Sequence, residues 1–231
     1  MKSWAKSPVA TKTRDFFHRH WQGALRWREK LVLKEEAFHL GLAAIVGVIG
    51  GLVNVFFFYA GEMVQRVFLM RPGDPVQEAE LFAPWQRLFV PALGGLAAGL
   101  ILYLGLRWVG KQGSSDLLEV VVAGDGKLPF RTESVKTASA LVSIATGASI
   151  GREGGITQLS ATLASKLGQI AGWPPYRLRL LVGCGASAGI AAAYNAPITG
   201  AVFASLIVLG NFSMNLFAPL VCAAVMATMT S

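Results

Sequence analysis

Uncharged residues fall into two long runs in the first half of the chain. Leu40–Ala60 contains 21 residues without a charge, and Leu88–Leu106 forms a second run of the same kind. At a rise of about 1.5 Å per residue, about 20 apolar residues cross the hydrocarbon core of a bilayer. The two runs are therefore predicted to be transmembrane helices, joined by a polar loop over 71–86.

The rest of the chain divides into shorter apolar segments. Leu117–Ala123 is too short to span, and the Ser and Asp residues before it and Gly124 after it favour a short helix. After Pro129, glycine, proline and asparagine interrupt the apolar sequence repeatedly, and no charged residue follows Arg179. Short, broken and tilted helices are typical of channels and transporters with a site at mid-depth. The sequence predicts an all-α integral membrane protein, with further helices over 135–150, 155–171, 178–192, 197–209 and 213–230.

Composition supports a membrane location, and the distribution of charge gives an orientation. Charged residues make up 15% of the chain, against roughly 25% in a soluble domain. The net charge is +8, and nine of the 21 Lys and Arg lie in residues 1–34, where only Asp15 and Glu29 oppose them. We expect residues 1–36, with an amphipathic stretch over 14–36, to form a basic cytoplasmic or interfacial helix at the inner membrane, and 37–231 to form a multi-pass transmembrane domain. A soluble docking helix is the alternative for 14–36, and charge confined to this segment argues against a nucleic-acid partner.

Two neighbouring charges interrupt the apolar sequence at Gly151-Arg152-Glu153-Gly154. From Ala138 to Ala164 no other side chain is charged. Ionisable residues inside a membrane are costly and usually mark a pathway for ions or protons. A helix over the apolar run that follows would point its free N–H groups and its partial positive charge at this motif. The motif predicts an anion site beside a carboxylate, with the candidate anion-binding residues Gly151, Arg152, Gly154, Gly155 and Ile156.

Other chemistry has little support in the sequence. The three histidines, at positions 18, 20 and 39, lie in the N-terminal basic region, and no nucleophile–base pair or metal-ligand set is visible. Neither an enzyme nor a cofactor is predicted. Cys184 and Cys222 both lie in apolar segments and are predicted to be buried free thiols.

Three motifs, in order along the chain, resemble signatures of the CLC family of chloride channels and chloride/proton exchangers. Gly151-Arg152-Glu153-Gly154 is similar to the family's GREGP, and Lys136 stands where the family carries a lysine ahead of it. The run 183–200, which contains Asn195 and Pro197, is similar to GAAAGLAAAFNAPLAG. The match extends from about Gly113 to Ser231, and the first 112 residues agree in layout only. The resemblance implies a CLC-like helix bundle, the first of two inverted halves; a chain of this length is expected to be truncated or to need a partner.

The resemblance also implies roles for individual residues. Glu153 would be the gate, which occupies an anion position when ionised and swings away when protonated; a simple helix cap is the alternative. Ser114, or else Ser115, would bind the anion through its hydroxyl, and Asp116 would cap the short helix that follows. Arg152 is expected to be structural rather than a direct ligand.

Departures from the family pattern bear on the mechanism. Gly155 replaces the family's proline and is expected to loosen the gate loop. Leu206 and Ile207 stand in the region where exchangers carry a proton-delivering glutamate, so passive conduction is favoured. The predicted function is transmembrane chloride transport, channel-like and gated by Glu153, with chloride/proton exchange or a half-chain without activity as alternatives. An organic-anion transporter is disfavoured because 183–201 offers no recognition group. The implied partners are chloride or a similar small anion, the bilayer and, in full-length family members, a second copy in a homodimer.

Overall fold

The computed structural model describes residues 37–66, 84–110, 117–122, 124–210 and 214–231. The predicted basic helix over 14–36, most of the predicted loop over 71–86, and the candidates Ser114, Ser115 and Asp116 lie outside these residues. The chain divides into a unit Met1–Gly41 and a compact unit Leu42–Ser231. The candidate site lies wholly in the second unit.

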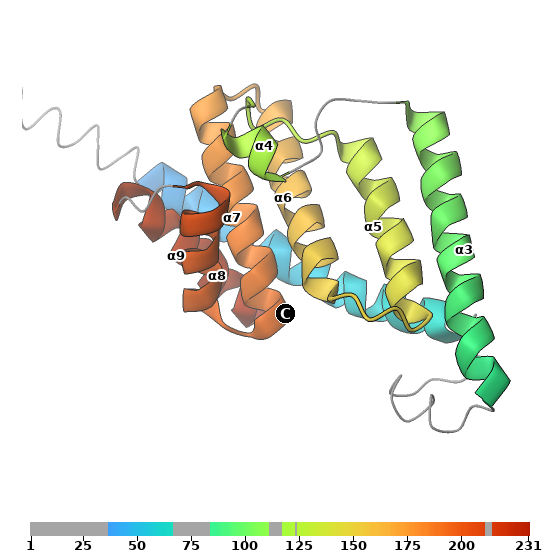
Figure 1. The fold of residues 1–231 in the computed structure, drawn as a ribbon. Helices are drawn as coiled ribbons and strands as arrows, with labels where there is room; N and C mark the ends of the chain where they lie inside the picture. Colours follow the sequence, from blue (N-terminus) through green and yellow to red (C-terminus); the bar gives the residue numbers. More distant parts are fainter. Residues whose placement is uncertain (1–36, 67–83, 111–116, 123, 211–213) are drawn as a thin grey trace, which may run out of the picture. The chain divides into compact units, whose positions relative to one another are not determined.

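Helices make up all the regular structure of the described residues (Figure 1). Two of them are long and apolar enough, by length and composition, to cross a membrane: Ala37–Arg66, with a mean hydropathy of 2.3, and the Arg87–Val109 part of α3, with 2.0. These helices contain the two predicted spans. The others are α4 (Leu117–Val122), α5 (Phe130–Ala145), α6 (Arg152–Ile170), α7 (Pro175–Tyr194), α8 (Pro197–Phe203) with its π-helical continuation Ala204–Val208, and α9 (Met214–Thr230); α3 itself is Pro84–Val109.

Most predicted segments are present, and three of the differences bear on the site. The helix predicted over 135–150 is α5, which begins and ends five residues earlier, because Pro129 starts it and a turn with Gly147 at a φ of 100° ends it. The helix predicted over 155–171 begins at Arg152, so the glycines after Glu153 lie in its first turn and not in a loop. The segment predicted over 197–209 changes from α-helical to π-helical winding at Ala204.

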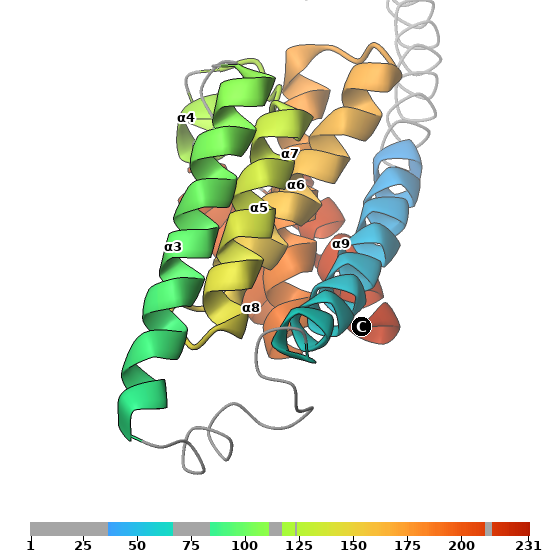
Figure 2. The same cartoon turned by 90° about the vertical axis from the view of Figure 1, so that its right-hand side faces the viewer.

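Helices α3, α5 and α6 stand side by side, and α7 follows behind them (Figure 2). Between α3 and α5, the hydroxyl of Ser139 donates to the carbonyl of Ala98 at 2.8 Å. Large side chains on the other face of α3 are exposed, including Leu88 at 70% and Leu96 at 71%. An apolar exposed face of this kind fits a helix that contacts lipid.

Helix α7 is the central element, because α6, α8 and α9 all pack on it. Glycines allow the closest of these contacts, as expected where helices associate in lipid. A Cβ on Gly185 would lie 2.7 Å from the carbonyl oxygen of Ser160, and one on Gly189 would lie 2.7 Å from the Cα of Thr157. These two contacts fix the antiparallel register of α6 against α7.

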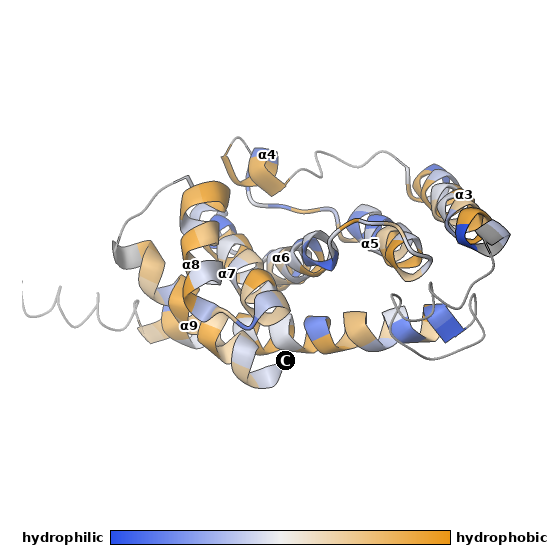
Figure 3. Ribbon diagram, turned by 60° about the horizontal axis from the view of Figure 1, so that its bottom comes forward, coloured by the Kyte–Doolittle hydropathy of each residue, from blue (hydrophilic) through white to orange (hydrophobic). Residues whose placement is uncertain are grey.

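Apolar residues run along much of α8 and α9, whereas α5 and α6 carry more polar positions (Figure 3). Several of the polar positions on α5 and α6 are buried, among them Glu133, Thr157 and Ser160. Buried polar groups are expensive in an apolar medium and are therefore the first place to look for function.

Candidate functional site

The start of α6 forms the candidate site. Gly151 precedes the helix with a φ of −67° and a ψ of 138°, and no side chain caps it. The first amides of an α-helix have no acceptor within the helix, and they carry a partial positive charge. Because Gly151 is the N-cap residue of α6, these free amides belong to Gly151, Arg152, Glu153 and Gly154. The amides of Gly155 and Ile156 instead point at carbonyls one turn back, at Gly151 and Arg152.

The carboxylate of Glu153 lies back over the start of its own helix. A Cβ added to Gly151 would collide with Oε2 of Glu153 and lie 3.1 Å from its carboxyl carbon. The carboxylate therefore occupies the space that a side chain at position 151 would fill. Only glycine at this position leaves that space free, which gives a physical reason for the Gly-Arg-Glu order.

The neighbours of Glu153 point in different directions. Arg152 is exposed, and Gly154 opens onto free space, with nothing within 4 Å of a Cβ built on it. Gly155 packs against the ring of Phe57, 2.9 Å from a Cβ built at that position. Gly155 thus admits an aromatic ring beside the first turn, where the sequence predicted a loosened loop. Ile156 is 1% exposed and contributes its side chain to the core.

Tyr194 was not among the predicted site residues. It is the last residue of α7, and the end of this helix lies beside the start of α6 because Gly189 of α7 packs on Thr157 of α6. The next residue, Asn195, has a left-handed conformation with a φ of 53° and ends the helix, and Pro197 begins α8. The signal in the sequence was a polar phenol at the end of a run of Gly and Ala, directly before Asn-Ala-Pro.

The loop after α4 is fixed by side chains from α6 and α7. The guanidinium of Arg179 donates twice to the carbonyl of Gly124, at 3.1 and 2.7 Å. Ser165 accepts from the amide of Leu128 at 3.0 Å and donates to the carbonyl of Gly126 at 2.6 Å. These bonds hold the C-terminal end of α4, the short helix that follows the candidate ligands Ser114 and Ser115.

A partly buried ion pair lies within α5, and a hydrogen bond joins it to α6. The carboxylate of Glu133 is fully buried, 3.4 Å from Nζ of Lys136, and accepts a hydrogen bond of 2.7 Å from Gln158. Lys136, predicted as a motif residue, is therefore the partner of a buried acid. The sequence analysis did not single out Glu133, although an acidic residue at the head of an apolar segment is itself a signal.

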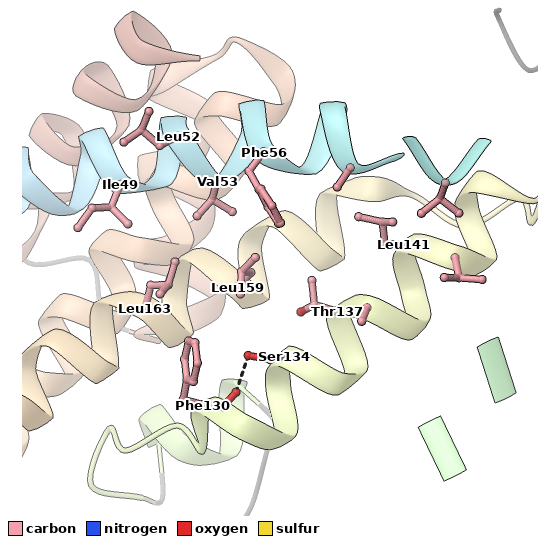
Figure 4. A pocket seen from close by; sticks show the side chains of 14 residues that line it. Ile49, Leu52, Val53, Phe56, Phe130, Ser134, Thr137, Leu141, Leu159 and Leu163 are labelled. Carbon is pink, nitrogen blue, oxygen red and sulfur yellow. Dashed lines mark hydrogen bonds between the residues drawn. The ribbon is translucent and has the colours of Figure 1, made fainter. Parts of the chain in front are cut away.

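A cavity of about 650 Å³ lies between the Ala37–Arg66 helix, α5 and α6 (Figure 4). Its wall is almost wholly hydrocarbon, and the hydroxyl of Ser134 is turned to the carbonyl of Phe130 at 2.8 Å. A wall of this kind offers no donors to an anion. The cavity is therefore separate from the candidate anion site at the start of α6.

Four other predicted positions are also placed. Leu206 and Ile207 lie in the π-helical segment and are 57% and 51% exposed. Cys184 is a buried free thiol as predicted, but Cys222 is only partly buried.

Known proteins are similar to this chain in sequence and in fold. A family model described as "Voltage gated chloride channel" matches residues 94–231. A putative chloride channel protein ClcB-like from Ralstonia nicotianae is 42% identical over 192 residues, which cover 81% of this chain and 45% of that protein. The voltage-gated ClC-type chloride channel ClcB of Yersinia pseudotuberculosis is 35% identical over 195 residues, covering 83% and 47%.

One solved structure, titled as that of a slow cyanobacterial Cl⁻/H⁺ antiporter, matches with a TM-score of 0.63 at 21% identity. The match covers 83% of this chain and 45% of that one, and it shows a shared fold. The chain thus spans about half the length of the relatives that it matches, with shares of 45% and 47% of the two ClcB proteins.

Proposed function

The chain belongs to the voltage-gated chloride channel (CLC) family, and on this premise we propose that it supplies one half of a chloride pathway across a membrane. The family is one of transporters and channels, and its members are membrane proteins. The anion would be held at the start of α6, with Glu153 as the gate.

The position of the Glu153 carboxylate carries this proposal. A carboxylate against Gly151 lies at the start of α6, where the free amides of Gly151, Arg152, Glu153 and Gly154 are the donors that chloride would use. Protonation would remove the negative charge and with it the competitor. Because α6 starts early, we take these four amides as the anion-binding group. Gly155 and Ile156 would then serve to pack the first turn.

Channel-like conduction is the form of transport that the apolar residues near the end of α8 favour. Leu206 and Ile207 carry no ionisable group, so neither can pass a proton toward Glu153. Chloride/proton exchange is the alternative, which would need another internal proton donor. A half-chain that binds chloride without conducting is the second alternative.

Ser114 or Ser115 would supply a hydroxyl from the segment before α4. The other end of α4 is held by Arg179, which binds the carbonyl of Gly124. We further propose that the protein resides in the inner membrane with a cytoplasmic N-terminus, and that it forms a homodimer when its site is complete. These proposals rest on the basic N-terminal charge and on family membership.

Chloride efflux from proteoliposomes that contain this chain, at neutral and at acid pH, tests the proposal. We expect efflux above that of empty liposomes, increased by acid, and efflux that is high and independent of pH in Glu153→Ala. Glu62→Ala, which changes a partly exposed glutamate paired with Arg66, is the matched control and should behave as the wild type. Unchanged acid dependence in Glu153→Ala would refute the gate. A folded chain without efflux in any variant would support the half-chain alternative.

A further inference from the structure

We propose that Phe57, on the long apolar helix Ala37–Arg66, is a positioning residue for the anion site: its ring packs on Gly155 and so holds the first turn of α6 in place. This inference rests on the proposed role of that turn in binding an anion. It adds to the site a helix that the sequence analysis treated only as a membrane span.

Contacts with α7 fix the position of this long helix. Gly50, Asn54 and Phe57 follow one another at steps of four and three residues, so they share one face of the helix. A Cβ on Gly50 would lie 2.6 Å from the Cβ of Ala188, and the side-chain amide of Asn54 donates to the carbonyl of Ala192 at 3.2 Å. The two contacts follow α7 toward its C-terminal end, and Phe57 comes next on the same face.

The ring of Phe57 meets the backbone of α6 at Gly155. The start of α6 lies beside the C-terminal end of α7, because Gly189 of α7 packs on Thr157 of α6. A Cβ built on Gly155 would lie 2.9 Å from Cζ and 3.0 Å from Cε2 of the Phe57 ring. Any side chain at position 155 would therefore have to push the ring and the first turn of α6 apart.

The ring has little room to move away from Gly155. Phe57 is 4% exposed and belongs to a buried apolar cluster with Val53, Leu141 and Ile156. Because Ile156 follows Gly155 in the chain, the cluster includes part of the same first turn. Close-packed side chains of this kind transmit a displacement from one element to the next. The first turn of α6, which no side chain caps, is thus held by packing from the long helix.

The two neighbouring phenylalanines do not share this contact. Phe56 and Phe58 are 61% and 59% exposed, so neither ring is a core side chain. Phe56 instead lines the apolar cavity between the long helix, α5 and α6 (Figure 4). Of these three consecutive aromatic residues, only Phe57 is buried against the start of α6, and its neighbours serve as matched controls.

An anion that is held by backbone amides depends on where those amides point. Donors are effective only when packing keeps them at the position that the charge will occupy. Leucine at position 57 stays apolar but is too short to reach Gly155, so the first turn would lose its support. If the anion loses the equivalent of one hydrogen bond, its affinity falls about fivefold.

Calorimetric titration of the detergent-solubilised chain with chloride at neutral pH tests the inference. All variants are compared in the Glu153→Gln background, where no carboxylate competes with chloride. Phe57→Leu should bind chloride about fivefold less tightly than this background, and Phe58→Leu should match it. Gly155→Ala should also weaken binding, because its methyl group pushes on the ring. Combining Phe57→Leu with Gly155→Ala should restore part of the affinity, because the methyl group takes the space that the ring has left.

The outcomes separate this inference from the function on which it rests. If Glu153→Gln binds chloride and Phe57→Leu does not weaken that binding, the anion site stands and the role of Phe57 is refuted. If the losses from Phe57→Leu and Gly155→Ala simply multiply when combined, the two residues act independently and the inference also fails. If Glu153→Gln binds no chloride, the proposed function fails, and the role of Phe57 in anion binding fails with it.

Hydrogen exchange distinguishes a positioning role from a general loss of stability. The amides of Gly155 and Ile156 point at carbonyls one turn back, so their exchange reports whether the first turn is closed. Phe57→Leu should speed their exchange about fivefold and leave the rest of α6 unchanged. Gly155→Ala makes the same test on Ile156 should Phe57→Leu not fold. Exchange that rises equally along the whole of α6, or not at all, would overturn the proposal.

Discussion

Replacing Gly189 by alanine tests whether the α6–α7 contact sets the geometry of the site. A Cβ at this position would lie 2.7 Å from the Cα of Thr157, 3.1 Å from its nitrogen and 3.2 Å from the carbonyl oxygen of Ile156. All three neighbours are backbone atoms of α6, so no side chain can rotate out of the way. The shortest distance is about 0.7 Å below the 3.4 Å of ordinary contact, and the two helices must separate by a similar amount.

The expected loss of stability is a balance of two effects. Alanine in place of glycine favours a helix by about 1 kcal/mol. Overpacking a tight contact costs about 1–3 kcal/mol. Gly189→Ala should therefore lower the free energy of unfolding by up to about 2 kcal/mol. Gly99→Ala is the matched control, because nothing lies within 4 Å of a Cβ on Gly99 in α3.

Thermal unfolding in detergent, followed by the helical circular-dichroism signal, gives the comparison. Gly99→Ala should unfold at the wild-type temperature or above it, and Gly189→Ala below it. If Gly189→Ala were as stable as Gly99→Ala, the packing account would be wrong.

Three further changes test other parts of the structure. Gly151→Ala places a methyl group in the space that the Glu153 carboxylate occupies and that a bound anion would need, so the double variant Gly151→Ala/Glu153→Gln should bind chloride less tightly than Glu153→Gln alone in calorimetric titration at neutral pH; equal affinities would contradict this. Lys136→Met leaves Glu133 buried without its ion pair and should lower the free energy of unfolding by about 1–3 kcal/mol, less than for a fully buried pair because Lys136 is partly exposed. Chemical denaturation checks this, and adding Glu133→Gln should recover most of the loss; an equal loss in both backgrounds would refute the pairing. Arg179→Lys removes one of two hydrogen bonds to the end of α4 and should speed hydrogen exchange over 124–128 by about tenfold; unchanged exchange would show that the arginine does not hold this loop.

Long apolar runs and strong breaks made most of the helices predictable. The spans around 40–60 and 88–106, the short helix after Asp116 and the break at Asn195–Pro197 follow from local chemistry alone. The start of α5 was less predictable, because Arg131, Thr132 and Glu133 suggest a loop although the last two are buried in the protein. Local polarity does not reveal that a neighbouring helix will cover a residue.

The candidate site was predictable only where it lies within one segment. Glu153 stands out because a carboxylate between glycines in an apolar stretch has few structural explanations. The sequence pattern predicts a break at the glycines because glycine disfavours helix interiors, yet the first helical turn tolerates them. The position of the end of α7 beside the start of α6 could not be predicted, because it depends on the register of the two helices, and that register is set by close approach at Gly185 and Gly189.

The polar bonds around the loop 124–128 have a consequence for the order in which the protein matures. The chain emerges from the ribosome N-terminus first, so α4 is made before Ser165, Gln169 and Arg179 exist to receive its end. A six-residue helix is too short to cross the bilayer alone. Its terminal N–H and C=O groups would have no hydrogen-bond partners in lipid. The segment before α5 must therefore wait at the membrane surface until α6 and α7 have inserted and paired. The polar bonds around 124–128 would then form late, as the last step of threading this part of the chain into the membrane.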